Sequence, residues 1–538
     1  MIRKTCVWVS PLLVGLVACA VPETRDASVE PGEVSVDGGQ IVGAPAREGE
    51  AVWAYLGIPY AAPPVGDGRW RPPQPVELWT GVRDATQLPP GCMQRSLPVS
   101  PGADPFFGAG ATTFQEDCLY LNVWSAARAG DDTPVLVWIH GGGLFVGDGA
   151  EVGNDGTSLA VRGAVVVTIN YRLGPFGYLA HPLLREESDD DASGNYGVLD
   201  QIAALRWVQR NIGRFGGDPD RVTIFGESAG SWSVNYLMAT PLARGLFASA
   251  IGQSGGAFGS LAGAASRDVA EATGERVAAA ILGLDTTVSL DALRSSSAEN
   301  VLAAADSTPR PNVDGWVLPD TVYNIFAAGN QHDVPVIVGA NADEGTALRA
   351  LGQADGITTV EQYRAQARQE YGDLADEFLD LYPAEKDEDV VPMLIDSSGD
   401  GRFVWEMRTW ARMMDTVSSP AYLYLFARVP PAADADRYGA YHTAEIPYVF
   451  NNLRGDSLYW YANRDYDDTD RQLSQVMSSY WLNFAATGNP NGEGVPAWPA
   501  HSGDDDVAME FGDSVQVRQG LRMERLDFFD RHHAAGGF

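Results

Sequence analysis

The sequence predicts an α/β fold with a mainly parallel sheet. Continuous apolar runs at residues 135–139, 164–169 and 222–225 are typical of strands that are buried on both faces. Between the last two of these runs, residues 195–211 have helical periodicity, with one apolar face made of Leu199, Ile202, Leu205, Trp207 and Val208. Strands that alternate with helices pair through crossover connections, so we expect one large sheet flanked by helices.

The remaining segments extend this arrangement. In chain order we expect a first hairpin at 34–41, an extended Pro- and Gly-rich loop at 56–70, a strand at 119–124, largely helical insertions at 265–302 and 362–396, and strands at 335–339 and 422–426. Either helical insertion has the character of a cap or lid over a site. No break in composition divides residues 40–530, which predicts a single domain over residues 40–538.

Composition restricts the partners of this chain. The 538 residues carry a net charge of -34, which argues against nucleic acids and anionic membrane surfaces as partners. A solvated acidic surface is the simplest interpretation, and steering of a cationic substrate is the alternative. A hydrophobic content of 45% is enough to fill a large core.

The first 18 residues have the features of an export signal. Arg3 and Lys4 form a basic start, and the apolar stretch at 6–18 is too short to span a bilayer comfortably. We therefore expect a signal peptide over residues 1–18.

The end of this segment resembles a bacterial lipoprotein signal. Leu16-Val17-Ala18-Cys19 matches a signal whose cleavage leaves an acylated cysteine as the first residue, so we expect Cys19 to be lipidated. Residues 19–39 are then a flexible acidic tether. The protein is expected to be exported from a bacterial cytoplasm and anchored to a membrane only through this lipid. An ordinary secretory peptide cut after Ala18 or Ala20, giving a periplasmic or secreted protein, is the alternative.

Two cysteines lie outside the signal. Cys92 and Cys118 form an even pair in an exported chain, which favours one disulfide, with two buried free thiols as the alternative. Closing a loop of about 26 residues stabilises the fold by roughly 3 kcal/mol in the chain-entropy model. Neither cysteine has a His or Cys partner nearby in the sequence, so no metal site is expected.

The pattern Gly-x-Ser-x-Gly occurs twice. At 226–230 it follows an apolar strand and precedes a segment with few helix breakers, so Ser228 is placed on a strand–turn–helix elbow. At 252–256 the serine is Ser254, and three glycines stand in the next five residues. A helix there is penalised by about 1 kcal/mol per glycine, so only Ser228 gains a helix N-terminus.

Acyl transfer through a serine needs a base, a group that orients the base, and donors for the oxyanion. Gly142 and Gly143 follow a buried strand, and their N–H groups can serve as donors together with that of Ala229. His140 adjoins this glycine run and is expected to hold the loop by hydrogen bonding.

The base is one of seven histidines. His442 follows a strand and a loop downstream of the serine, which fits the Ser, acid, His order of such elbows. The other five histidines lie in polar terminal or loop segments. The orienting acid is expected just after the strand at 335–339, where the spacing does not choose between Asp343 and Glu344.

These motifs together resemble the type-B carboxylesterase family, which includes the cholinesterases and p-nitrobenzyl esterases. The resemblance spans residues 34–530, and its matching segments are 56–61, 116–119, 140–143, 226–230, 343–345, His442 and 481–491. It implies an α/β-hydrolase fold and a carboxylesterase that uses no cofactor or metal.

The resemblance also implies roles for individual residues. Ser228 is the expected nucleophile, His442 the base and Glu344 the orienting acid, with Gly142, Gly143 and Ala229 as the oxyanion hole. Glu227 is expected to be a carboxylate beside the triad, and Ser254 a neighbour that hydrogen bonds to it. The resemblance implies the Cys92–Cys118 disulfide as well.

A departure from the family pattern restricts the range of substrates that we expect. Cholinesterases have a tryptophan in the disulfide loop that contacts choline, whereas this loop carries Phe106, Phe107 and Phe114 and no tryptophan. We expect small to medium, uncharged esters. A lipase acting on longer acylglycerols and a catalytically silent adhesion protein of the same fold are the alternatives, and the sequence does not indicate an oligomeric state.

Overall fold

The computed structural model describes residues 32–47, 51–95, 111, 113–259, 261–283, 288–304, 309–346, 356–433, 435–453, 464–503 and 505–536. The predicted signal peptide, Cys19 and most of the tether lie outside these residues, as do Phe106 and Phe107. Within the described part of the chain, no helix combines the length and the apolar character needed to cross a bilayer.

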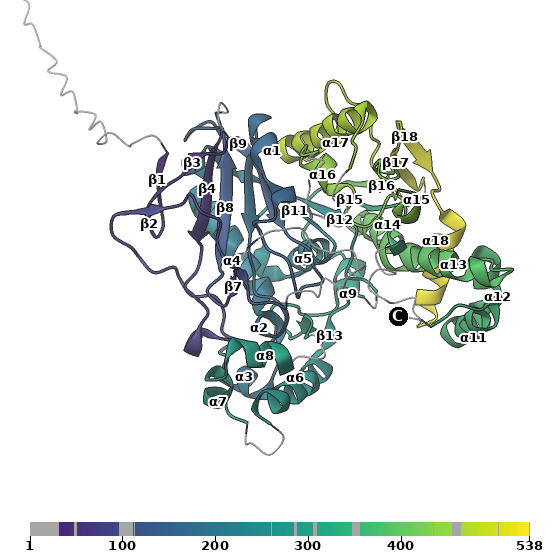
Figure 1. Ribbon diagram of the computed structural model, residues 1–538, viewed down its shortest axis with the longest axis horizontal. Helices are drawn as coiled ribbons and strands as arrows, with labels where there is room; N and C mark the ends of the chain where they lie inside the picture. Colours follow the sequence, from purple (N-terminus) through teal and green to yellow (C-terminus); the bar gives the residue numbers. More distant parts are fainter. Residues whose placement is uncertain are drawn as a thin grey trace, which may run out of the picture.

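An eleven-stranded sheet runs through the centre of the molecule (Figure 1). In spatial order its strands are β18 (Val515–Gln519), β17 (Val507–Phe511), β16 (Ala421–Phe426), β15 (Val336–Asn341), β12 (Ser249–Gln253), β11 (Gly217–Glu227), β9 (Thr133–Ile139), β10 (Val165–Ile169), β8 (Tyr120–Ser125), β4 (Trp53–Pro59) and β3 (Ala44–Pro45). Every neighbouring pair from β17 to β10 is parallel, and the outer pairs are antiparallel. The predicted α/β fold with a mostly parallel sheet is confirmed.

Both faces of the sheet are buried. Along β9, Val135, Val137 and Ile139 join one hydrophobic cluster, while Leu136 and Trp138 join another. Alternate side chains of a strand point to opposite faces, so the two clusters are the two layers of the core. This explains why the sequence of the strand is an unbroken apolar run.

Helices cover each layer. The first cluster includes residues of α4 (Tyr196–Asn211), α5 (Ala229–Ala239) and α14 (Trp405–Met413). The second includes residues of α1 (Thr157–Val161), α16 (Ile446–Val449) and α17 (Asp468–Thr487). Because α5 follows β11 directly, its N-terminus lies at the carboxyl end of the parallel strands.

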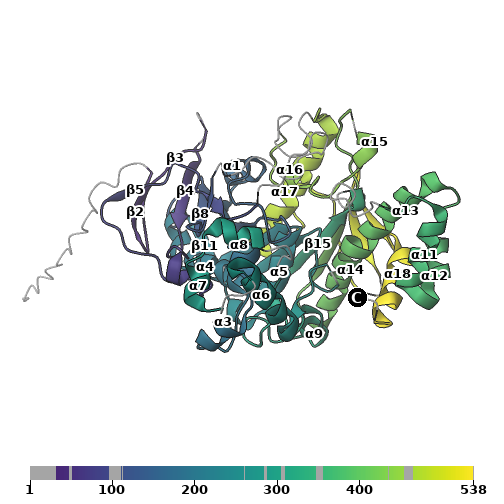
Figure 2. The same cartoon turned by 60° about the horizontal axis from the view of Figure 1, so that its bottom comes forward.

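The two predicted helical insertions are helical. The first contains α6 (Arg267–Leu282), α7 (Leu290–Arg294) and α8 (Ala298–Ala304), which group together in Figure 2. The second contains α11 (Val360–Tyr371), α12 (Ala375–Leu381) and α13 (Asp387–Gly399), beside the C-terminal α18 (Met523–Ala534) in Figure 1. The strands β17 and β18 and the helix α18 were not predicted from the sequence.

Short elements complete the fold. They are the predicted hairpin of β1 (Glu33–Val36) and β2 (Gly39–Val42), then β5 (Val82–Asp84), β6 (Gly91–Cys92), β7 (Phe114–Gln115), β13 (Ala265–Ser266), β14 (Asn312–Val313), α2 (Gly174–Tyr178), α3 (Pro182–Glu187), α9 (Val322–Ala327) and α15 (Ala435–Tyr438).

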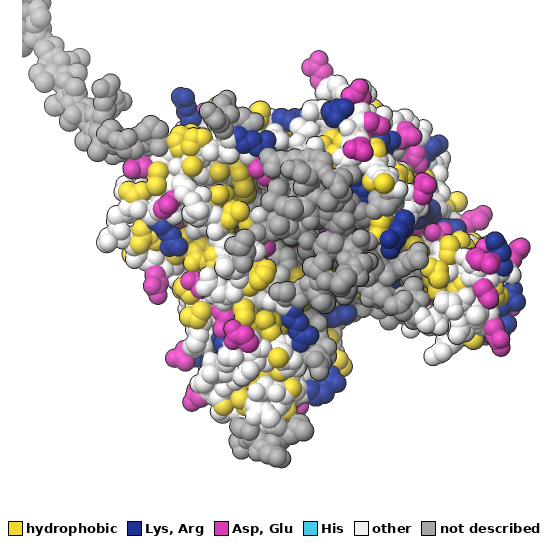
Figure 3. All heavy atoms as spheres, in the orientation of Figure 1, with side chains coloured by type: hydrophobic (Ala, Val, Ile, Leu, Met, Phe, Trp, Pro, Cys, Tyr) yellow, Lys and Arg dark blue, Asp and Glu magenta, His cyan; other side chains and the backbone are white. Residues whose placement is uncertain are grey.

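On the face shown in Figure 3, acidic and basic side chains are interspersed over the described elements.

Candidate active site

The predicted elbow forms at Ser228, between β11 and α5. Ser228 has φ 56° and ψ -123°, a conformation that side chains rarely adopt and that turns the chain sharply. Both glycines are needed for close packing: a Cβ on Gly226 would lie 2.6 Å from the carbonyl carbon of Gly230, and one on Gly230 would lie 2.1 Å from Ile139 O. Ser228 is partly exposed and stands at the N-terminus of α5.

The glycine run after β9 lies beside this serine. A Cβ on Gly141 would be 3.2 Å from Ser228 Cβ. Gly142 and Gly143 have φ values of 97° and 64°, and a Cβ on Gly142 would lie 2.1 Å from Val146 O. The turn is closed by other N–H groups, those of Phe145 and Val146, which both donate to Gly142 O. The predicted oxyanion donors therefore lie in a glycine turn next to Ser228.

His140 holds the start of this turn, as expected. Its Nδ1 lies 2.9 Å from Gly141 O, and its ring stacks on Tyr171 with centroids 4.5 Å apart. Tyr171 also donates its hydroxyl hydrogen to His140 O. Burial lowers the pKa of His140 to about 4, so the ring is neutral at pH 7.

The structure brings Glu344, not Asp343, to His442. Glu344 Oε2 lies 2.6 Å from His442 Nδ1, and Glu344 Oε1 accepts the Asn341 N–H at 2.7 Å. Asp343 points elsewhere: its Oδ2 accepts the N–H of Ala440 at 2.7 Å. Of the two acids that the spacing left open, Glu344 is the one that contacts the His442 ring, while Asp343 fastens the loop that carries His442.

The other ring nitrogen of His442 faces Glu227. Nε2 lies 3.1 Å from Glu227 Oε1, and Glu227 immediately precedes Ser228. Burial lowers the pKa of His442, but the carboxylates of Glu227 and Glu344 outweigh this effect and raise it to about 9. Burial also raises the pKa of Glu227 well above its usual range. Both pKa shifts favour retention of a proton by the buried Glu227–His442 pair.

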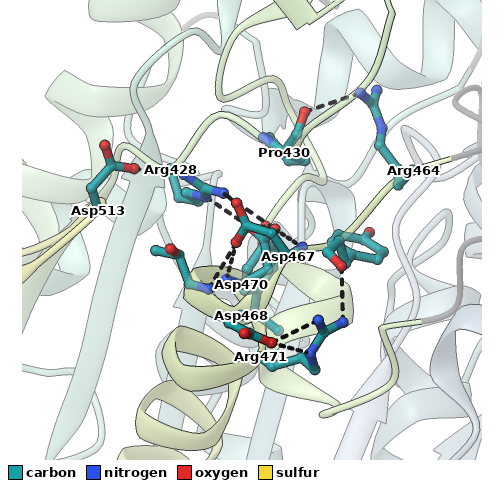
Figure 4. A network of polar contacts seen from close by, with 11 residues as sticks. Arg428, Pro430, Arg464, Asp467, Asp468, Asp470, Arg471 and Asp513 are labelled. Carbon is teal, nitrogen blue, oxygen red and sulfur yellow. Dashed lines mark hydrogen bonds and ion pairs between the residues drawn. The ribbon is translucent and has the colours of Figure 1, made fainter.

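Contacts with neighbouring side chains position the His442 ring and the segment that follows it. The ring of Phe403 lies 4.8 Å from the His442 ring, between centroids. The helices that follow the His442 loop are tied to the end of β16: Arg428 contacts Asp470 of α17 at 2.7 Å (Figure 4), and the hydroxyl of Tyr448 in α16 donates to the same carboxylate. This network fixes the segment after the histidine relative to the sheet.

A strained glycine turn, an elbow serine and a buried His–Glu pair at the carboxyl ends of parallel strands are the parts that acyl transfer requires. Comparison with known proteins agrees with this arrangement. The model of the carboxylesterase family matches residues 30–529. The chain belongs to the carboxylesterase family.

Individual members of the family are similar to this carboxylesterase over most of their length. It is 39% identical to the fumonisin B1 esterase of Sphingopyxis macrogoltabida over 476 residues, which cover 87% of this chain and 85% of the relative. It is 38% identical to the para-nitrobenzyl esterase of Bacillus subtilis, over 84% of this chain and 89% of the relative. It is 35% identical to the human cocaine esterase, over 89% of this chain and 87% of the relative. The protein is thus a carboxylic ester hydrolase with an α/β-hydrolase fold.

The predicted disulfide of this carboxylesterase is present. Cys92 and Cys118 are bonded, and both are buried. The bond closes a segment whose ends pair as β6 and β7, and Phe114 at the start of β7 is exposed.

Ser254 differs in part from its expected role. It lies at the end of β12, next to β11, but its side chain is fully buried, and its Oγ has no hydrogen-bond partner among the described residues. The structure therefore does not show the expected hydrogen bond from Ser254 to the triad. The difference is in burial, because Ser254 is followed by the buried residues 255–259, whereas Ser228 is partly exposed.

Sequence reasoning missed a third buried carboxylate near the base. Glu445 is fully buried, and its oxygens accept from Gln253 Nε2 at 2.9 Å and Asn341 Nδ2 at 2.6 Å. Burial raises its pKa, and the charge of Glu344 adds to the effect. Its position three residues after His442 was the only signal in the sequence, and that spacing alone does not show that the side chain is buried.

Proposed function

We propose that this carboxylesterase hydrolyses small to medium, uncharged esters through an acyl-enzyme on Ser228. The observation that carries the proposal is the buried contact of 2.6 Å between Glu344 and His442, beside an elbow serine and a glycine turn. Glu344 orients His442 and stabilises its protonated form, so that Nε2 can act on the serine side.

The reaction follows from these positions. As Ser228 Oγ attacks the ester carbonyl, His442 Nε2 takes its proton, and the carbonyl oxygen gains negative charge. The N–H groups of Gly142, Gly143 and Ala229 stabilise that oxyanion. Nε2 then protonates the departing alcohol, and water, activated by the same nitrogen, hydrolyses the acyl-enzyme.

Two aromatic side chains beside the site support an uncharged substrate. The ring of Phe145 lies against Gly143, since a Cβ on that glycine would be 2.2 Å from it, and Phe145 is 39% exposed. Phe403 covers His442. The relative from Bacillus subtilis is named for para-nitrobenzyl esters, which are uncharged at the ester and aromatic at the alcohol.

A series of p-nitrophenyl esters of increasing acyl length tests the substrate. We expect kcat/KM to be highest for soluble short and medium chains and to fall for long chains. A phosphonate ester should label Ser228 alone, as mapped by peptide mass analysis. Higher activity on triacylglycerol emulsions than on soluble esters would show a lipase instead, and absence of labelling with absence of turnover would show a silent member of the fold.

We also propose that Cys19 carries a lipid that anchors the enzyme to a membrane of the exporting cell. The support is the lipoprotein-like pattern that ends at Cys19. Wild-type enzyme should partition into detergent and incorporate labelled palmitate, and Cys19→Ser should do neither. Soluble, unlabelled wild-type enzyme would contradict the anchor without affecting the proposed chemistry.

A further inference from the structure

The glycine turn that supplies two proposed oxyanion donors has little secondary structure of its own. Residues 140–149 follow β9 and belong to no helix or strand. Other parts of the chain hold this loop from outside: the Gly174 N–H donates to Leu144 O, and Asn170 Oδ1 accepts from the Gly149 N–H. The position of the donors thus depends on contacts made by residues distant in sequence.

Gln94 makes the most specific of these contacts. Its carboxamide forms a two-point pair with the backbone of Gly147: Nε2 donates to Gly147 O at 2.9 Å, and Oε1 accepts the Gly147 N–H at 2.9 Å. The side chain is buried, so these hydrogen bonds do not compete with bulk water.

Gly147 in turn packs against the start of the glycine turn. It has φ 102°, and a Cβ on it would lie 2.6 Å from His140 Nδ1 and 2.8 Å from Gly141 O. Gly147 is therefore packed directly on the segment that leads into Gly142. A displacement of Gly147 would move or loosen that segment, since no space separates them.

The disulfide fixes Gln94 in turn. Gln94 lies two residues after Cys92, and its Nε2 also donates to Cys92 O at 3.0 Å. A second contact also joins the disulfide-closed segment to the loop at 140–149: Asp148 Oδ2 accepts the N–H of Ala111, which lies in that segment. The bond between Cys92 and Cys118 thus holds residues that contact the oxyanion turn at Gly147 and Asp148.

We propose that Gln94 is a positioning residue for ester hydrolysis, which holds the oxyanion turn in its active geometry through Gly147, with the Cys92–Cys118 bond as its support. The proposal rests on the oxyanion donors of the proposed function. Its specific consequence is that loss of the carboxamide weakens stabilisation of the tetrahedral intermediate more than it weakens substrate binding.

The main test replaces Gln94 with an apolar residue of similar length, Gln94→Met. Rates are expressed per site titrated with a phosphonate ester, so only folded enzyme is counted. We expect kcat to fall about 10-fold, less than the about 10²–10³-fold loss on deleting a donor outright, with KM changed less than about 3-fold. Affinity for an aryl trifluoromethyl ketone, which adds Ser228 to give a tetrahedral oxyanion, should fall by the same factor as kcat.

Gln331→Met is the matched control. Gln331 is also a buried glutamine whose Nε2 donates to nearby residues, Met413 O and Thr416 Oγ1, but it lies before β15, at the opposite end of the strands from the triad. It should lower the melting temperature and leave kcat per titrated site within about 2-fold. If Gln94→Met behaves like this control, or lowers kcat without weakening the ketone, Gln94 has only a structural role and the proposal is wrong.

Two further variants complete the test. If Gln94→Met does not fold, Gln94→Glu replaces it. The glutamate keeps an acceptor for the Gly147 N–H but has no donor for the two carbonyls, so the same losses of kcat and of ketone affinity are expected.

The role of the disulfide is tested in a Cys92→Ala/Cys118→Ala background, where Gln94→Met should lower kcat less than in wild type. If the losses of kcat are additive, the disulfide does not support Gln94. Ser228→Ala distinguishes failure of the proposed function from failure of this inference. Activity in Ser228→Ala overturns the proposed function, whereas an inactive Ser228→Ala with a normal Gln94→Met overturns only this inference.

Discussion

The two Gly-x-Ser-x-Gly turns are a natural internal comparison. Ser228 and Ser254 end neighbouring parallel strands, and the residues before them, Glu227 and Gln253, are direct partners in the sheet. Both serines have the same unusual backbone, with φ values of 56° and 55°. The next segment of the chain differs, because α5 begins after Ser228, whereas a buried non-helical loop comes after Ser254.

The loop after Ser254 needs side chains where α5 needs none. Asn235 Oδ1 accepts the Ala257 N–H, and the two oxygens of Glu406 accept those of Phe258 and Gly259. The N–H groups of this loop are thus bound by side chains of α5 and α14, whereas α5 begins at Ser228 without a side-chain cap. A strained serine turn is therefore not enough to indicate a nucleophile: Ser228 is partly exposed and precedes a helix, whereas Ser254 is buried and precedes a loop.

The largest expected effect comes from exchanging the two serines for alanine. Ser228→Ala should lower kcat by about 10⁵-fold or more, because the proposed acyl-enzyme cannot form without this hydroxyl. Ser254→Ala should cost less than about 10-fold, since its hydroxyl is buried and forms no hydrogen bond among the described residues. Burst-phase kinetics with a p-nitrophenyl ester measure both. An acyl-enzyme burst in Ser228→Ala would reverse the assignment.

The second comparison concerns two adjacent acids after β15. Glu344→Gln should lower kcat by about 10³–10⁴-fold, because an amide no longer stabilises the protonated imidazole. Asp343→Asn should cost about 10-fold or less, because its remaining oxygen can still accept the Ala440 N–H. Steady-state kinetics at saturating substrate decide between them, and the opposite ranking would make Asp343 the orienting acid.

These two acids also show what the sequence can and cannot predict. Continuous apolar runs predicted β9, β10 and β11, because burial on both faces leaves a local pattern. The choice between Asp343 and Glu344 has no local signal, since it depends on which side chain turns toward His442, 98 residues later. The contacts of Gln94 and Glu445 were missed for the same reason. The strand β18 is half-exposed and polar, so its composition resembles a loop.

Glu227→Gln makes the residue before Ser228 identical to the one before Ser254. The Glu227 carboxylate favours the protonated form of His442, and a base must be neutral to act, so removing that charge should lower the pKa of His442 from about 9. The ascending limb of kcat/KM against pH should therefore move to lower pH. Gln331→Met, which lies at the opposite end of the strands, is a control that leaves this limb in place, and an unmoved limb in Glu227→Gln would show that Glu227 does not share the proton.

The smallest expected effect concerns the loop after Ser254. Burial raises the pKa of Glu406 from 4.5 to about 8. A carboxyl with a raised pKa in the folded state contributes stability that is present below pH 4.5 and is lost as the pH rises toward 8. The melting temperature of Glu406→Gln relative to wild type should therefore increase between pH 5 and pH 8 and level off above that. A constant difference across that range would mean that Glu406 is ionised throughout.

The order of strands in the sheet has a consequence for biosynthesis. The strand β9 lies between β10 and β11, but β15 and β16, which extend the parallel core and precede Glu344 and His442, are made much later. At about 5–20 residues per second, the roughly 320 residues between Cys118 and His442 take on the order of 15–65 s to synthesise. Within that time β12 is an open hydrophobic edge from its own synthesis until β15 emerges, about 80 residues later. Long-range parallel pairing of this kind folds slowly and exposes aggregation-prone intermediates, so we expect the nascent chain to depend on chaperones until its C-terminal third has emerged.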